Sequence, residues 1–340
     1  MATTLADVAA LAGVSVQTVS NALNNPALLK RSTLDRVLAA VDELDYAPNL
    51  QARRLRRQTV ATIGLRIEPV VDNVAASLLD RFLHELTARA DALGKHVVLF
   101  TASDDEEEVR KIRELAGQRV ADSFLLTSTH LGDARVPALL DEGIAFAAFG
   151  RPWGEAPTHS WVDVDGAAGT ADATAALLDA GHERIGFVGW PAGSGSGDDR
   201  RRGWAEAMAE RLGLDDAALD ALTVRCEDRV ADALDAVEPL LSLGVTALVC
   251  ASDSLATGSI GAAGQRGAQL PVIGFDNTSL AAGLGFPSVD QSLGEVASAA
   301  LAALDAEPGA ITTIVRPQLV RRDDARWGIV PAADRGPSPS

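Results

Sequence analysis

The sequence predicts a small all-α domain followed by a large α/β body, and two patterns indicate this division. Residues 1–57 carry short helical patterns interrupted by a glycine and a proline, whereas strand and helix patterns alternate from Thr59 onward. Alternating strands and helices are typical of parallel sheets covered by helices on both faces. We therefore predict a multidomain chain in which an all-α domain precedes two doubly wound α/β subdomains.

The N-terminal region reads as two helices joined by a tight turn, followed by a third helix. Residues 5–12 form the first helical pattern, Gly13 allows the turn, and Ser15 can cap a second helix that runs to about Leu23. The third helix has apolar residues at helical spacing, and we expect them to close a three-helix core: Leu34, Val37, Leu38, Val41 and Leu44. This arrangement predicts a helix-turn-helix.

A fourth, short helix is predicted after Pro48, with Asn49 as its cap. It covers residues 50–57 and carries Leu55 among four arginines. A helix this short with almost no apolar face is unstable alone in water. We expect it to fold only when another surface supports it.

The body contains two series of buried-strand patterns. The first covers residues 60–65, 96–100, 123–126 and 144–149, and the second, which we begin at Trp161, covers 184–188, 246–250 and 272–275. Two such series predict two subdomains with a ligand cleft between them. The tail 331–340 is rich in Pro, Ser and Gly, lacks leucine heptads, and is predicted to be disordered.

Charge is distributed unevenly along the chain. The total is −17, but residues 1–57 hold seven Lys/Arg against five Asp/Glu, so this part carries +2 and the remainder −19. An acidic body repels DNA, which confines any DNA contact to the N-terminal region.

Several classes of protein are not indicated. No run of about 18 apolar residues and no secretory signal occur, and two cysteines form no disulfide framework, so we expect a cytoplasmic protein without a membrane span. No catalytic constellation or metal-ligand spacing is present, so we expect no enzyme, no metal and no cofactor. Residues 193–197 lack the Lys-Ser/Thr of a phosphate-binding loop, and we expect a flexible loop at the cleft mouth.

Together these motifs closely resemble the lactose-repressor (LacI) family of bacterial transcription regulators. The similarity is dense over the first 57 residues, including Tyr46-x-Pro48-Asn49 and the Ala-x-x-Leu of the hinge helix. It continues more loosely through Val164-Asp165-Gly166, Gly181-His182, Ser252-Asp253, Gly274-Phe275-Asp276 and Gln291.

The resemblance implies how the chain is divided. Residues 1–46 would be the DNA-binding domain, 47–58 the hinge helix, and 59–330 a body similar to periplasmic sugar-binding proteins. In that body the chain crosses between subdomains three times. One subdomain would cover about 59–160 with 291–318, and the other 161–290 with 319–330.

The second helix has the side chains for reading bases in the major groove. Gln17 and Asn21 can each pair with adenine, and Val16 can contact a thymine methyl group. Thr4, Ser15, Thr18, Ser20 and Asn24 suit phosphate oxygens. The resemblance adds contacts from Leu5, Tyr46, Asn49, Ala52, Arg53 and Arg56, and it implies that Leu55 of each subunit wedges between base steps from the minor groove. Because two hinge helices must meet, a homodimer on a near-palindromic DNA operator is expected, without a tetramer.

The cleft should hold charged groups that grip a polar ligand and rings that cover it. The resemblance assigns Arg200 and Asp276 to effector binding, although the contiguous Arg200, Arg201 and Arg202 leave the register open. Further candidates follow strand ends, the crossover or family motifs: Arg66, Trp161, Trp190, Ser252, Asp253, Phe275 and Gln291. Trp153 and Trp204 are interpreted as core side chains.

The main hypothesis is a repressor of carbohydrate uptake or catabolic genes that a small sugar releases from its operator. A regulator sensing a nucleoside or another non-sugar metabolite is an alternative. A free sugar-binding protein is another, opposed by the DNA-reading region. The effector's identity, its action as an inducer or as a corepressor, the operator and the target genes stay open.

Overall fold

The computed structural model describes residues 5–16, 18, 19, 22, 29–44, 61–67, 73–154, 158–322, 326 and 327. The chain forms two compact units, residues 1–59 and 60–340. This division in sequence falls where the helical and the α/β patterns were predicted to meet.

The small unit is built from helices around a short apolar core. Its helices are α1 (Leu5–Ala12) and α3 (Arg31–Glu43), and residues 16, 18, 19 and 22 are helical as well. Gly13 has a φ of 62°, a conformation that glycine adopts without a Cβ clash, so α1 ends in the expected tight turn. Val8, Val19 and Val37 are fully buried and join the three helical segments.

One core prediction in this unit is wrong. Leu38 is 43% exposed, whereas Val37 and Ala40 are buried. Leu38 lies about 100° around the helix from Val37, because an α-helix has about 3.6 residues per turn. The small side chain of Ala40 fills the inward position instead, which lets α3 lie close to the other helical segments.

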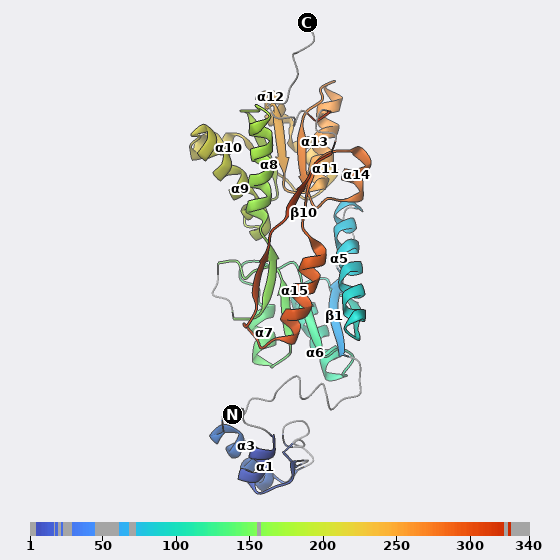
Figure 1. Cartoon of the computed structure of the whole chain (residues 1–340), viewed down its shortest axis with the longest axis vertical. Coiled ribbons are helices and arrows are strands. Elements are labelled where there is room, and N and C mark those ends of the chain that lie inside the picture. Colours follow the sequence, from blue (N-terminus) through green and yellow to red (C-terminus); the bar gives the residue numbers. More distant parts are fainter. Residues whose placement is uncertain are drawn as a thin grey trace. The chain divides into compact units, whose positions relative to one another are not determined.

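The large unit consists of two lobes, each built on a six-stranded sheet of the described residues (Figure 1). The first sheet has the order β11-β5-β4-β3-β1-β2 and the second the order β12-β10-β9-β8-β6-β7. All neighbouring strands are parallel except β10 and β12. The strands of the first sheet are β1 (Ala61–Ile67), β2 (Lys95–Thr101), β3 (Ser123–Leu126), β4 (Phe146–Phe149), β5 (Trp161–Val164) and β11 (Thr312–Val315). Those of the second are β6 (Ile185–Gly189), β7 (Thr223–Arg225), β8 (Ala247–Cys250), β9 (Val272–Phe275), β10 (Ser288–Asp290) and β12 (Gln318–Val320).

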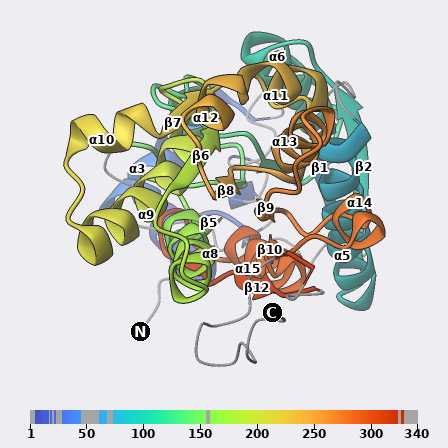
Figure 2. The same ribbon diagram turned by 90° about the horizontal axis from the view of Figure 1, so that it is seen from above.

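Helices cover both faces of each sheet, which confirms the predicted doubly wound architecture. In Figure 2, α8 and α9 lie on one side of β6 and β8, and α11 and α13 lie on the other. The first lobe carries α5 (Asn73–Ala92), α6 (Asp105–Gly117), α7 (Arg135–Asp141) and α15 (Leu293–Asp305). The second carries α8 (Gly166–Asp179), α9 (Gly195–Leu212), α10 (Asp216–Ala221), α11 (Val230–Ala236), α12 (Glu238–Ser242), α13 (Asp253–Gln265) and α14 (Ser279–Leu284).

The central strands are mostly buried, as expected for parallel sheets covered on both faces. Every residue of β3, β8 and β9 is buried, whereas in the edge strand β2 only Lys95 is buried and the other residues are half-buried or exposed. The hydrophobic patterns of these strands therefore located them closely in the sequence.

The chain passes between the lobes three times, after β5, after β10 and after β11. The prediction that the second series begins at Trp161 is wrong, because β5 pairs in parallel with both β4 and β11 of the first sheet. The first crossing follows Val164, where Asp165 caps α8 by accepting a hydrogen bond from the Ala168 N–H. The other two crossings lie within a few residues of the positions expected at 290/291 and 318/319.

Candidate effector cleft and DNA-binding unit

A cleft of about 700 Å³ lies between the two lobes of the large unit. Its described walls come from strand ends and from the segments that follow them, the usual position of ligand sites in parallel sheets. The volume falls within the range of about 300–1,000 Å³ that is common for small-molecule sites. The cleft is lined by Arg66, Leu78, Leu79, Phe82, residues 127–130, Phe149, Gly150, Trp153, Asp163, Val164, Gly166, Trp190, residues 194–196, Asp199, Arg200, residues 227–229, Gln291 and Leu293.

Arg200 is a buried cation of the cleft wall that is held by several contacts. It is 7% exposed, and its guanidinium carbon lies 3.7 Å from the ring centroid of Phe275 and 4.8 Å from that of Trp190. Its Nη1 donates to the carbonyl oxygen of Ala251. Such a cation, held by two rings and a carbonyl, keeps one orientation toward a ligand.

The structure also separates the three contiguous arginines. Arg201 pairs with Asp220 at 2.6 Å, and Arg202 pairs with Asp199 at 2.6 Å. Neither lines the cleft. Arg200 is therefore the arginine that faces the ligand space, in the register that the family resemblance implied.

Asp276 lies behind Arg200 and is not among the residues that line the cleft. Its Oδ1 is 3.6 Å from Nη1 of Arg200 and accepts a hydrogen bond of 2.6 Å from Nε2 of Gln291. Burial raises the pKa of the Asp276 carboxyl to about 8, although the Arg200 charge acts in the opposite direction. In this structure Asp276 holds Arg200 and Gln291 in position.

Asp253 and Ser252 support the same region. The buried carboxylate of Asp253 accepts hydrogen bonds from the N–H and hydroxyl of Thr278, at 2.7 and 2.8 Å, and from Ser288 at 2.6 Å. Ser252 caps α13 and donates to Asp228, which does line the cleft. These two predicted effector residues fix the loops around the cleft and are not themselves lining residues.

Trp153 is a lining residue that the sequence pattern assigned to the core. It follows the end of β4 in the first lobe, and its ring lies against the start of α9 in the second. A Cβ built on Gly195 would be 2.2 Å from this ring, so only glycine leaves room for it. The guanidinium of Arg151 covers the ring at 4.7 Å. The position of Trp153 after a strand end, like that of Trp190, was the signal that could have identified it.

The glycine-rich stretch 193–197 does not form the expected flexible loop. Residues 195–197 are the first turn of α9, and Ser194 caps the helix by accepting a hydrogen bond from the Gly197 N–H. Ser194, Gly195 and Ser196 line the cleft. The glycines serve close packing against the two tryptophans, because a Cβ on Gly197 would be 3.0 Å from Trp190.

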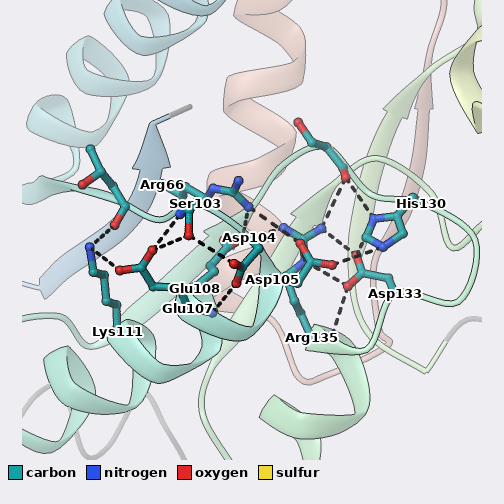
Figure 3. Close-up of polar contacts among 12 residues, drawn as sticks. Arg66, Ser103, Asp104, Asp105, Glu107, Glu108, Lys111, His130, Asp133 and Arg135 are labelled. Carbon is teal, nitrogen blue, oxygen red and sulfur yellow. Dashed lines mark hydrogen bonds and ion pairs between the residues drawn. The ribbon is translucent and has the colours of Figure 1, made fainter. Parts of the chain in front are cut away.

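A charge network in the first lobe includes two residues of the cleft wall, Arg66 and His130 (Figure 3). Glu108 is 1% exposed and accepts hydrogen bonds of 2.8 Å from both Arg66 and Arg135. Arg135 also donates to both oxygens of Asp133, at 2.9 and 2.6 Å. The pKa of Asp133 is lowered by Arg135 despite its burial. The network therefore fixes the segment 127–134, whose first four residues line the cleft.

Asp105, His130 and Asp133 have potential metal-ligand atoms within 4.8 Å of one another. Two guanidinium groups occupy the same cluster, because Arg66 and Arg135 each lie 3.7 Å from Asp105. We interpret the cluster as part of the charge network, since the arginines already compensate its carboxylates.

In the small unit, few of the predicted DNA-reading residues are described. Ser15 caps the second helical segment, and its Oγ accepts a hydrogen bond of 3.1 Å from the Thr18 N–H. Val16 is half-buried against the unit's core, and the backbone of Leu5 begins α1. The other predicted DNA contacts lie outside the described residues: Thr4, Gln17, Ser20, Asn21, Asn24, Tyr46, Asn49, Ala52, Arg53, Leu55 and Arg56.

Of the nine predicted effector residues, Arg66, Trp190, Arg200 and Gln291 lie on the cleft wall. Phe275 lies against Arg200, next to Asp276. Trp161 does not line the cleft: it is half-buried in β5 and packs on the apolar cluster that includes Phe124 and Phe146. Trp204 is fully buried, as interpreted from the sequence.

The described part of the chain contains no helix that is long and apolar enough to span a membrane.

A helical N-terminal unit followed by a two-lobed α/β body with an interlobe cleft is the architecture expected of a transcription regulator. Residues 4–49 match the bacterial regulatory proteins of the lacI family, and residues 174–323 match the periplasmic binding protein-like domain. The transcriptional regulator GalR of Escherichia coli K12 is 30% identical over 94% of both chains. The chain belongs to the LacI family, and it is a regulator and not an enzyme.

Solved structures agree with this assignment. A complex of the transcriptional regulator CelR with cellobiose is 26% identical, with a TM-score of 0.68, and the match covers 94% of this chain and 99% of that one. The lac repressor dimer bound to operator and the anti-inducer ONPF shares the fold, with a TM-score of 0.65 at 22% identity over 95% of this chain and 98% of that one.

Proposed function

We propose that the chain is a repressor that binds a near-palindromic operator as a homodimer and is released when a small sugar occupies the interlobe cleft. The observation that supports the sugar is the lining of the cleft. Arg200, Gln291 and Asp228 offer charged and amide groups to hydroxyls, while Trp153 and Trp190 offer rings to the apolar face of a sugar. The relatives include GalR and the CelR–cellobiose complex.

The cleft also suggests how binding would be transmitted. Its walls come from both lobes, with Trp153 from the first and Arg200 from the second, so a bound sugar would favour one relative setting of the lobes. We propose that this setting changes the spacing of the two hinge segments 47–58 in a dimer. Because the hinge helix is marginal by its sequence, a small change in spacing would unfold it and weaken operator binding.

A ligand screen on the full-length chain tests the sensing role. A compound present at about 100 times its Kd adds about 2.7 kcal/mol to the folded state, which raises the melting temperature. We expect sugars to stabilise the chain and nucleosides and amino acids not to. Arg200→Ala should abolish the shift, whereas Arg201→Ala should keep it, because Arg201 pairs with Asp220 outside the cleft. Stabilisation by a nucleoside alone would replace the sugar in this proposal.

Operator binding tests the regulatory half. Operator sequences selected from random DNA should be near-palindromic, and the sugar that stabilises the protein should lower its affinity for them. An increase in affinity would make the sugar a corepressor and contradict release.

Leu55→Ala tests the hinge, for which the proposal rests on the sequence. A wedge that opens a base step contributes to specific sites only. The variant should therefore weaken operator binding much more than binding to random DNA, measured at one salt concentration. Equal losses on both DNAs would contradict the wedge.

A further inference from the structure

A second, small cavity adjoins the cleft in the first lobe. Its volume is about 20 Å³, and it shares Thr129, His130 and Trp153 with the cleft wall. A cavity of at least about 10–15 Å³ can hold one water-sized group. The remaining lining residues are Asp133, Val136, Pro152, Thr158 and His159.

Unpaired polar groups surround this cavity. His159 is only 2% exposed, and neither of its ring nitrogens has a hydrogen-bond partner among the described residues. The indole N–H of Trp153 is also buried and without a partner among them. Buried polar groups are almost always hydrogen-bonded, because an unpaired one loses its interaction with water and gains nothing. Two of the residues that line the cavity, His159 and Trp153, therefore carry buried polar groups without a protein partner among the described residues.

The surroundings of His159 fix its ring and favour its neutral form. Its ring lies 5.4 Å from that of Phe146, with an interplanar angle of 31°. Burial lowers the pKa of His159, which favours the neutral imidazole with one donor and one acceptor nitrogen. The carboxylate of Asp133, which lines the same cavity, accepts hydrogen bonds from Arg135 on both oxygens. Its charge is therefore compensated without a bound cation.

We propose that this side cavity is a specificity subsite that receives one hydroxyl-sized group of the sugar in the cleft. In this subsite a hydroxyl would accept from the Trp153 N–H and donate to the unprotonated nitrogen of His159. This inference rests on the proposed function, because it needs a sugar in the adjoining cleft. A resident water has the same hydrogen-bonding chemistry, and the experiment separates the two sources.

The test uses the full-length protein and isothermal titration with galactose, cellobiose and the single-position deoxy analogues of whichever sugar binds. On the wild type, one analogue should bind at least about tenfold more weakly than its parent sugar, since its missing hydroxyl leaves the subsite unpaired. In His159→Phe the parent sugar should lose about the same factor, and that analogue should bind as well as the parent. Trp153→Phe removes the indole donor and should give the same pattern, which keeps the test decisive if His159→Phe fails to fold.

Trp204→Phe is the matched control. Its indole N–H is likewise buried without a partner among the described residues, but Trp204 lines neither cavity. It should leave the ratio between parent and analogue unchanged. If every analogue keeps the same ratio in wild type, His159→Phe and Trp153→Phe, the cavity holds a water and the subsite is refuted while the sugar function stands. If no sugar binds the wild type, the sugar function and the subsite both fail.

Discussion

Replacing Gly203 with alanine should destabilise the second lobe at the crossing of α8 and α9. A Cβ built on Gly203 would lie 1.9 Å from the carbonyl oxygen of Ala167, which is backbone and cannot rotate away. At the same crossing the Thr170 hydroxyl donates a hydrogen bond of 2.7 Å to the carbonyl oxygen of Arg200. The new methyl group therefore separates two helices that are joined both by packing and by a hydrogen bond.

The size of the effect follows from this geometry. An ordinary contact begins at 3.4 Å, so the helices must move apart by about 1.5 Å. Overpacking of this kind costs about 1–3 kcal/mol, and loss of the Thr170 hydrogen bond costs about 1 kcal/mol more. Alanine returns about 1 kcal/mol through its better helix propensity. We expect a net loss of about 2 kcal/mol in the free energy of unfolding, or about 5 °C in melting temperature.

Urea denaturation and thermal unfolding of Gly203→Ala beside Gly264→Ala give the comparison. Gly264 lies inside α13, and a Cβ added there would meet nothing within 4 Å, so its alanine should stabilise by up to about 1 kcal/mol. Sugar binding should also weaken in Gly203→Ala, because Arg200 lies on the same helix one turn earlier. Surface substitutions usually change the free energy of unfolding by no more than about 0.5 kcal/mol. If Gly203→Ala and Gly264→Ala differ by less than this amount, the steric argument is refuted.

Two further changes test the buried charges. The pKa of Asp276 is about 8 in the folded state, which is higher than in the unfolded chain. Its contribution to the free energy of unfolding is therefore complete below about pH 4 and is lost as the pH rises through about 8. Between pH 5 and 8 the free energy of unfolding of the wild type should fall with rising pH, and Asp276→Asn should reduce this fall by up to about 1.4 kcal/mol per pH unit. Identical slopes for variant and wild type would contradict a raised pKa of the Asp276 carboxyl. Glu108→Gln should cost about 3 kcal/mol, because it leaves two buried arginines short of a partner. Glu206→Gln, which removes an exposed ion pair, should cost less than about 1 kcal/mol, and an equal loss in both would argue against the network.

The elements with a strong local signal could be predicted from the sequence. The central strands were placed closely because buried parallel strands carry continuous apolar runs, and the turn at Gly13 followed from its conformational freedom. Arg200, which the family resemblance assigned to effector binding, does lie on the cleft wall, and its contact with an effector stays a prediction. These features depend on a few neighbouring residues.

The features that could not be predicted depend on contacts between residues that are distant in the sequence. Nothing in the apolar run of β5 shows that it pairs with β11, about 150 residues later, so Trp161 was placed in the wrong lobe. Trp153 reached the cleft because Gly195, on the other lobe, leaves space for its ring. Asp253 and Asp276 do not line the cleft and are tied by hydrogen bonds to Thr278, Ser288 and Gln291, so their expected effector contacts stay predictions. Spacing along the chain does not show such pairings.

The three crossings between the lobes have a consequence for synthesis on the ribosome. The first sheet lacks α15 on one face until residue 305 has been made, and it lacks its edge strand β11 until residue 315 has been made. At about 5–20 residues per second, the 151 residues between Val164 and Val315 take roughly 8–30 s. Until α15 has been made, the apolar strands β3, β4 and β5 lack the helix that covers them on that side, while the small N-terminal unit is already complete in sequence. We expect the nascent first lobe to expose apolar surface for most of this time, which favours aggregation.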